Sequence, residues 1–260
     1  MGPIGIIGGS GLYELLDDPR HETVETPYGA PSSPVSLGTI GGVEVAFLTR
    51  HGKGHAVPPH LINYRANLKA LASLGVQNLI TSSVVGSLRA DYAPGHFVLT
   101  DQYVDRTWGR VDTFFEGPEV VHVSLAKPYC PQLRQTAHSA LSDLEETFHP
   151  TGTSVVIQGP RFSTRAESQW YQKMGWDVLS MTQHPETALA RELAMCVANI
   201  SFVSDLDAGV PGVQDEPVTA GMVWRTVAEG QPRIKAALTE IVGRVPDLTH
   251  CACRSALADT

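Results

Sequence analysis

The sequence predicts a single α/β domain. Along its 260 residues, apolar segments rich in β-branched residues alternate with segments of helical periodicity, the pattern of a sheet covered by helices. No repeat, low-complexity segment or linker divides the chain, and this length suffices for one large core. We therefore expect one domain over residues 1–248, followed by a cysteine-containing C-terminal tail over residues 249–260.

The expected elements follow from these patterns in chain order. Short apolar runs, several of them ending at glycine or a small polar residue, predict strands at residues 4–8, 43–48, 78–83, 96–100, 154–158, 177–180 and 196–203. Helical stretches are predicted at residues 60–74, 131–144, 164–173, 185–195 and 232–242. Ser163 or Thr164 suits a helix N-cap, and Pro185 suits a first helical turn. Residues 106–120 and 208–218 form loops long enough to carry function.

Charge and hydropathy exclude several classes of protein. The formal net charge is −8, whereas a nucleic-acid surface needs clustered Lys and Arg. No apolar run approaches the roughly 20 residues of a membrane span. The N-terminus enters a strand-like segment without the basic start of a signal peptide. We expect a cytoplasmic protein that binds neither nucleic acid nor membrane.

The four cysteines are Cys130, Cys196, Cys251 and Cys253. Cys196 lies in an apolar stretch and is expected in the core. The tail cysteines could bind a metal or oxidise, but a recognised four-ligand spacing is absent. An exposed, weakly ordered tail is favoured over a structural zinc site, and the role of Cys251 and Cys253 stays open.

Two carboxylates emerge where the last apolar strand should stop. Asp205 and Asp207 are two residues apart, so on a strand they point to the same side. Strand carboxyl ends are where α/β sheets build their sites. The alternative is a plain turn, in which Asp is common.

Three other segments can bind an anion after a strand. Gly8-Gly9-Ser10-Gly11 offers backbone N–H groups and a hydroxyl, although it matches no dinucleotide or Walker pattern. Arg50 and His51 follow the strand at 43–48, and an arginine there suits phosphate. The segment at 81–87 places hydroxyls before a glycine. Each alone is as consistent with a structural turn, but together they favour one anion site.

Histidines and an aromatic residue leave further alternatives open. His51, His55 and His60 suggest a metal, but two glycines between the first two indicate a loop instead of a helix, so catalytic zinc is disfavoured. Anion or substrate contacts are favoured for these histidines, with solvated loop side chains as the other alternative. Phe162 precedes a predicted helix and can present its ring to a nucleobase. Met181 is as consistent with core packing as with a sugar contact.

Eight segments occur in order along the chain: IGIIGGSGLYE, RHGKGH, NYRANLKAL, VGSLR, DQYVDRTWGR, GPRFSTRAES, MTQHPETALARE and SDLDAG. Together they resemble the purine nucleoside phosphorylase family, in particular its 5'-methylthioadenosine phosphorylase branch. The resemblance runs from Ile4 to about Val242. It implies a central mixed, partly barrel-like β-sheet flanked by helices, and a homotrimer.

The resemblance also implies a reaction and a set of residues. Phosphate cleaves a purine nucleoside into base and a ribose 1-phosphate derivative, with no metal and no organic cofactor. The implied phosphate ligands are Ser10, Arg50, His51, Ser83, the Val84 amide and Thr182. The implied purine contacts are Phe162, Met181, Ser163, Asp205 and Asp207. The implied contacts of the 5' substituent are Ala220, Val223 and Trp224, with His122 from a neighbouring subunit.

Three positions depart from the family pattern. Ser10 stands where threonine is common, Val85 replaces a small residue, and Trp224 stands where a smaller aliphatic group is expected. These changes concern the shape of the ribose and 5' pockets. The reaction itself does not depend on them.

The residue types suit this chemistry. Loss of the purine is assisted when an acid protonates N7, and Asp205 is the candidate, with burial and Asp207 raising its pKa. A carboxylate accepts the N6 amino group of adenine, so we expect 5'-methylthioadenosine to be preferred over 5'-methylthioinosine, and both over inosine. The alternatives are a 6-oxopurine phosphorylase, a nucleoside hydrolase and a binding module without activity.

Overall fold

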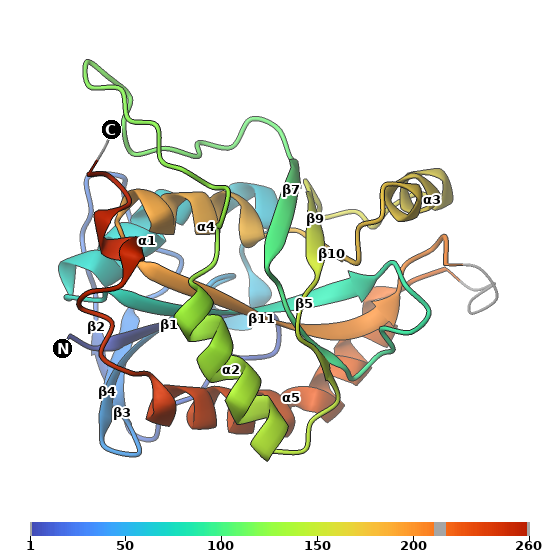
Figure 1. The fold of residues 1–260 in the computed structure, drawn as a ribbon, viewed down its shortest axis with the longest axis horizontal. Coiled ribbons are helices and arrows are strands. Elements are labelled where there is room, and N and C mark those ends of the chain that lie inside the picture. The colour runs from blue at the N-terminus through green and yellow to red at the C-terminus, as the bar shows by residue number, and fades with distance from the viewer. Residues whose placement is uncertain (1, 211–216, 259–260) are drawn as a thin grey trace.

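The structure is a computed structural model that describes residues 2–210 and 217–258. Its centre is an eleven-stranded sheet with helices on both sides (Figure 1). The strands are β1 Ile4–Gly8, β2 Arg20–Glu22, β3 Val35–Ile40, β4 Val43–Thr49, β5 Asn78–Ser87, β6 Phe97–Leu99, β7 Gln102–Arg106, β8 Phe148–His149, β9 Thr153–Ile157, β10 Val178–Ser180 and β11 Cys196–Leu206.

The sheet is mixed and branches at β5. The main path runs β2-β3-β4-β1-β5-β10-β9-β7, while β11 pairs with both β5 and β6. β5 is parallel to β1 and β11 but antiparallel to β10. The predicted mixed central sheet in a single α/β domain is therefore confirmed. All eleven residues of β11 are buried, as expected for a strand covered on both faces.

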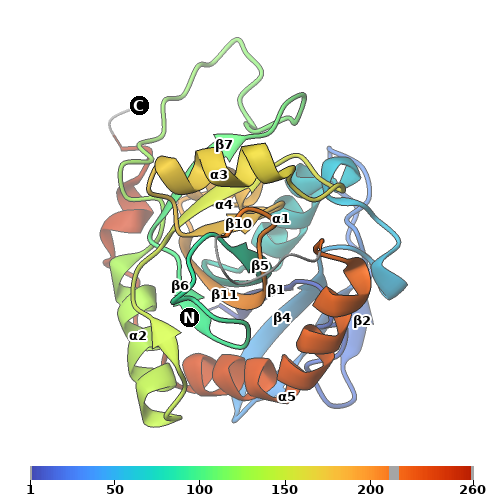
Figure 2. The same ribbon diagram turned by 90° about the vertical axis from the view of Figure 1, so that its right-hand side faces the viewer.

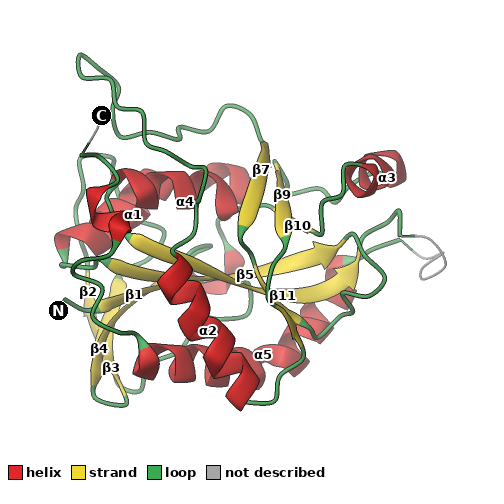
Figure 3. Cartoon of the chain, viewed as in Figure 1, coloured by secondary structure: helices red, strands yellow, loops and turns green. Residues whose placement is uncertain are grey.

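Helices cover the two faces as separate pairs (Figures 2 and 3). α1 packs against α4, α2 packs against α5, and both α4 and α5 contact β11. The helix α3 lies apart, beyond the end of the sheet. The bounds are α1 Tyr64–Ser73, α2 Pro131–Asp143, α3 Arg165–Lys173, α4 Gln183–Glu192 and α5 Ala220–Arg244.

Side-chain caps fix where three helices begin. Asn63 accepts from the Ala66 amide at the start of α1, and Thr219 caps α5. Thr164 and Glu167 form a reciprocal capping box at α3, which satisfies two otherwise unpaired amides. Of the two N-cap candidates, Ser163 and Thr164, it is therefore Thr164 that caps α3.

Strand predictions succeeded where the apolar signal was strong. β1 has the predicted bounds, and β4, β9, β10 and β11 differ by a few residues at their ends. β2, β3, β7 and β8 were missed: β2, for example, is three polar and largely exposed residues, and its strand form depends on pairing with β3. β5 runs to Ser87, so the structural turn that was one interpretation of residues 81–87 is wrong.

Helix predictions failed at one start. α5 begins at Ala220, twelve residues before the predicted start, and Pro232 lies inside it. Proline in a helix interior removes one backbone hydrogen bond, and the long amphipathic packing of α5 on the core tolerates this loss. In α4, His184 has extended backbone angles, so regular helix starts at Pro185 as predicted. The expected functional loop at 208–218 lies partly outside the described residues.

The C-terminal segment is packed against the domain. Cys253 is only 7% exposed, and Ala252–Ser255 form a 3-10 turn. Arg254 donates to the Gln77 and Ala194 carbonyls. The expected exposed tail is therefore wrong, because buried thiols and these hydrogen bonds hold it down. Within the described residues, no helix has the length and hydropathy needed to cross a bilayer.

Candidate active site

A cavity of about 290 Å³ opens where β5, β10 and β11 end. Twelve of the fifteen predicted site residues line it. They are Ser10, Arg50, His51, Val84, Phe162, Met181, Thr182, Asp205, Asp207, Ala220, Val223 and Trp224. Side chains from segments distant in the sequence thus converge on one pocket.

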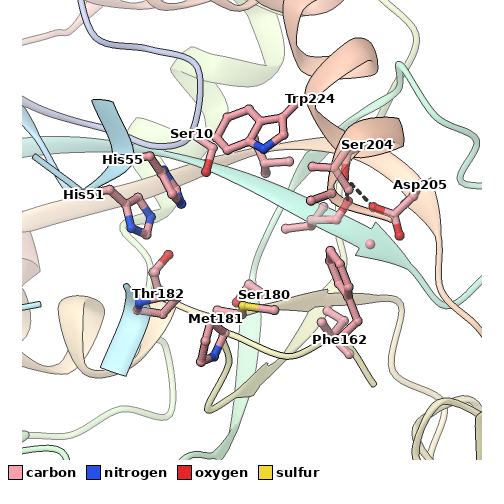
Figure 4. A pocket seen from close by; sticks show the side chains of 18 of the residues that line it. Ser10, His51, His55, Phe162, Ser180, Met181, Thr182, Ser204, Asp205 and Trp224 are labelled. Carbon is pink, nitrogen blue, oxygen red and sulfur yellow. Dashed lines mark hydrogen bonds between the residues drawn. The ribbon is translucent and has the colours of Figure 1, made fainter. Parts of the chain in front are cut away.

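The pocket has two chemically different ends (Figure 4). His51 lies at one end with Thr182 and Ser10 nearby, while Asp205 and Phe162 lie at the other. Trp224 lies across from Met181. One end therefore offers cationic and hydroxyl groups to an anion, and the other offers a ring and carboxyl groups to a flat polar molecule.

A β-bulge sets the position of Asp205. Pairing between β11 and β5 steps from Val203↔Val85 to Asp205↔Gly86, which leaves Ser204 without a partner. A bulge of this kind re-aims a side chain. A Cβ on Gly86 would lie 3.1 Å from Asp205 Oδ2, so glycine leaves room for the carboxyl group.

Burial keeps Asp205 partly protonated. The residue is 6% exposed, and burial together with the Asp207 charge raises its pKa to about 6, against a hydrogen bond from the Ser204 hydroxyl that lowers it. Ser204 Oγ donates to Asp205 Oδ1 over 2.6 Å. A carboxyl with a pKa near 6 can carry a proton at neutral pH in a useful fraction of molecules.

Asp207 and Ser163 each hold a buried polar atom without a partner. Asp207 Oδ2 and Ser163 Oγ make no hydrogen bond to the part of the chain that the structure describes. Burial raises the pKa of Asp207, and the nearby Ser168 and Ser163 hydroxyls oppose this rise. Buried polar atoms are normally satisfied, so Asp207, which lines the cavity, can offer its Oδ2 to a bound molecule. Ser163 does not itself line the cavity.

Arg50 is held by a glutamate that the sequence analysis did not identify. Arg50 Nε and Nη2 donate to Glu186 Oε2 and Oε1, each over 2.7 Å, and Nη1 donates to the Ser82 carbonyl. Both side chains are 1% exposed. The Arg50 guanidinium, which was expected to bind phosphate, is thus already paired with Glu186 along one edge. This leaves one N–H on each of its terminal nitrogens. Glu186 follows Pro185 in the first regular turn of α4.

His51 is neutral and has one free ring nitrogen. Its Nδ1 lies 2.9 Å from the Val57 carbonyl, which can only accept, so Nδ1 carries the proton. Burial, Arg50 and His55 lower the His51 pKa to about 3. The His55 ring stacks on His51 at 4.1 Å and meets Trp224 edge-on at 5.1 Å. His55 also lines the pocket, which agrees with substrate contact and not with a solvated loop position.

Ser83 and His122 lie outside the cavity lining. Ser83 Oγ accepts from Asn199 Nδ2 over 2.8 Å in the middle of the sheet, and its own hydroxyl proton is available. His122 is exposed, and its expected contact belongs to a neighbouring subunit. The roles of both stay predictions.

The pocket does not gather the three histidines of the metal alternative. His51 and His55 line it, but His60 is exposed and outside it. Among the described residues, the group able to hold a metal ion is instead formed by four cysteines. The lining residues that sequence reasoning missed are mostly apolar or small: Pro59, Gly86, Pro160, Leu179, Ser180 and Ser204. These residue types have no distinctive chemistry in the sequence, so only the fold shows that they line the pocket.

Known proteins resemble the chain over nearly its whole length. The family model of the phosphorylase superfamily matches residues 3–243. An S-methyl-5'-thioadenosine phosphorylase of Thermofilum pendens is 50% identical over 98% of this chain and 96% of its own. A purine nucleoside phosphorylase of Streptomyces coelicolor is 47% identical, covering 98% and 94%. The methylthioadenosine phosphorylase of Schistosoma mansoni, solved with adenine, superposes with a TM-score of 0.94 at 35% identity, covering 99% and 98%.

Proposed function

This chain belongs to the phosphorylase superfamily, and on that basis we propose that it cleaves 5'-methylthioadenosine with phosphate, giving adenine and 5-methylthioribose 1-phosphate. The observation that carries the proposal is the buried Asp205 carboxyl, with a pKa raised to about 6, in one pocket with Arg50 and Phe162. An acid, an anion-binding end and an aromatic face are the parts that phosphorolysis of a purine nucleoside requires.

Asp205 acts as the general acid. As the bond between the sugar and the base breaks, negative charge develops on the purine, and protonated Asp205 donates to N7. The proton comes from the carboxyl that burial keeps partly protonated, and such assistance contributes roughly 10²- to 10⁴-fold. Asp207 supports the raised pKa of its neighbour and accepts from the amino edge of adenine through its unpartnered Oδ2.

Phosphate binds at the opposite end of the pocket and attacks C1' of the sugar. Its ligands are the hydroxyls of Ser10, Ser83 and Thr182, the Val84 amide, and the remaining N–H groups of Arg50. Neutral His51 offers only a lone pair on Nε2, so it matches a phosphate oxygen that carries a proton. The negative charge of bound phosphate stabilises the oxocarbenium-like sugar in the transition state.

The remaining side chains select the substrate. Phe162 and Met181 pack on the purine, and Ser163 contacts its edge. Ala220, Val223 and Trp224 surround the 5' substituent, with His122 of a neighbouring subunit completing that pocket in a homotrimer. Trp224 narrows the space left for this substituent, which favours a small apolar group over a larger one.

The reaction needs inorganic phosphate as co-substrate and no metal or organic cofactor. The enzyme acts in the cytoplasm, in purine and methionine salvage. The catalytic unit spans residues 1–248, and residues 249–260 add a short cysteine-containing segment to it.

A 6-oxopurine phosphorylase is the second candidate. The relative from Streptomyces coelicolor carries the name purine nucleoside phosphorylase. Against this candidate, the base edge carries the buried carboxylate of Asp207, an acceptor that suits an amino group and opposes a carbonyl oxygen.

A substrate panel with and without phosphate tests the proposal. We expect kcat/KM for 5'-methylthioadenosine to exceed that for 5'-methylthioinosine by at least about 100-fold, since a site built for a hydrogen bond rejects analogues that lack it. Inosine is expected to be poorer still. Equal rates without phosphate would identify a hydrolase, and a preference for inosine would identify a 6-oxopurine enzyme.

A further inference from the structure

Four cysteine side chains meet at the end of β11 opposite the pocket. Cys130 precedes α2, Cys196 begins β11, and Cys251 and Cys253 come from the C-terminal segment. Their sulfur atoms all lie within 4.8 Å of one another. We call these four residues the thiol cluster. In Figure 1 the C-terminal segment, drawn in red, lies at the end of the sheet away from α3.

The spacing of the sulfur atoms resembles that of a tetrahedral metal site. Cys130 Sγ lies 3.7 Å from Cys251 Sγ. Four thiolates about 2.3 Å from a central zinc ion stand about 3.8 Å apart, because the site is tetrahedral. A pair of disulfides would instead need two S–S contacts of about 2.05 Å, and it gives no reason for all four sulfur atoms to converge.

A buried cation lies beside the thiol cluster. Arg191 Nε is buried and makes no hydrogen bond within the described residues. Arg191 is 7% exposed, and its charge acts on Cys253. A buried cation beside four convergent sulfur atoms offsets part of the negative charge that a tetrathiolate site carries.

The cluster is enclosed and held in place. Leu133, Ala198 and Leu248 pack around it in one apolar group. Arg254 Nη1 donates to the Gln77 carbonyl and Nη2 to Asn78 Oδ1, each over 2.6 Å. These bonds fix the 3-10 turn that carries Cys253 against the sheet, so the ligands are ordered by the fold itself.

We propose that the thiol cluster binds one Zn²⁺ ion through four thiolates as a structural site. Binding replaces the remaining thiol protons, which pass to solvent, and leaves no open coordination position, the mark of structural zinc. Cys196 and Asp205 are separated by nine residues of strand, or about 30 Å, so the ion takes no part in phosphorolysis. The site joins the C-terminal segment to α2 and β11.

Cobalt substitution tests the site directly. The protein is purified with reductant, stripped of metal by a chelator and titrated anaerobically with Co²⁺. We expect ligand-field bands of tetrahedral cobalt and thiolate-to-cobalt charge-transfer bands that saturate at one ion per chain and disappear when Zn²⁺ is added. Zinc is expected to raise the Tm of the stripped protein.

Matched variants assign the ligands. Cys130→Ser and Cys253→Ser should each weaken the charge-transfer bands, whereas His250→Ala, which changes an exposed neighbour of Cys251, should leave them unchanged. Arg191→Met should weaken Co²⁺ binding by roughly 10- to 100-fold, as loss of an outer partner does, and Arg191→Lys should restore most of it because it keeps the charge.

Other results would overturn the proposal. Reduced wild-type protein that binds no cobalt through thiolates would reject the site without relying on any variant. A spectrum that needs His250 would reject the four-cysteine ligand set. Freshly purified protein with no free thiols, and with the mass of two disulfides, would assign the cluster to covalent pairing instead of metal binding.

Discussion

Two stretches of β11 carry buried polar side chains, and they differ in how fully those side chains are satisfied. In the middle, Asn199 donates to Thr81 and Ser83 and accepts from Gln183 and Ser201. At the carboxyl end, Asp207 directly follows the strand and keeps a buried oxygen without a partner among the described residues. A satisfied polar network therefore holds strands together, whereas an unsatisfied polar group marks the place for a ligand.

Asp205→Asn at the unsatisfied end is expected to have the largest effect. The amide cannot act as the acid, so kcat should fall by roughly 10²- to 10⁴-fold while 5'-methylthioadenosine still binds. Steady-state kinetics and calorimetry measure the two quantities. Asp17→Asn, at an exposed carboxyl outside the pocket, is the control. Unchanged turnover in Asp205→Asn would show that this residue is not the acid. The carboxyl end of β11 would then differ from the middle without having this catalytic role.

Asn199→Ala at the satisfied stretch should cost stability. The substitution leaves several buried donors and acceptors unpaired, and each carries a penalty of about 1–3 kcal/mol. We expect a loss of about 3 kcal/mol in the free energy of unfolding, measured by denaturant titration. Ser142→Ala on the exposed surface of α2 should change it by less than about 0.5 kcal/mol. A similarly small loss in the free energy of unfolding for Asn199→Ala would show that the hydrogen-bond network does not hold these strands together.

Asp205 should also destabilise the fold at neutral pH, and this is the smallest expected effect. Its pKa rises from 3.8 to about 6 on folding, so the folded state holds a proton more tightly than the unfolded state. The corresponding stability is fully present below about pH 4 and is lost as the pH rises through about 6. Asp205→Asn should therefore be more stable than the wild type by roughly 2–3 kcal/mol above pH 7.

Thermal and denaturant unfolding across pH 4–8 measures this difference. The difference between the two proteins should shrink as the pH falls toward 4, because the carboxyl becomes neutral in the unfolded state as well only below its ordinary pKa of 3.8. A constant difference across this range would mean that burial does not shift the pKa of Asp205. The carboxyl end of β11 would then lack the titrating group that distinguishes it from the middle of the strand.

The sequence predicts the fold best where a segment's own pattern determines its structure. β1 and β11 are rich in apolar residues and were found, whereas β2 is polar and forms through its pairing with β3. Pro232 suggested a helix start, but α5 continues through it, because contacts of the whole helix with the core outweigh one lost hydrogen bond.

The site was predictable where a side chain has its own chemistry. Asp205 and Arg50 are recognisable from residue type and position at a strand end, and both line the pocket. Glu186 was not, since its importance comes from an ion pair with a residue 136 positions away. The thiol cluster was missed for the same reason: its members lie far apart in the sequence, and only Cys251 and Cys253 have a short spacing.

The pairing of β5 with β11 joins segments about 118 residues apart in the chain. Closing so long a loop costs entropy before any contact is gained, and folds dominated by such pairings form slowly. Gly86 and Asp205 face each other only after this pairing is complete, and Cys196 reaches its position by the same event. The Asp205 carboxyl therefore reaches its position late, and a chain that has not joined these two strands has neither its pocket nor its thiol cluster.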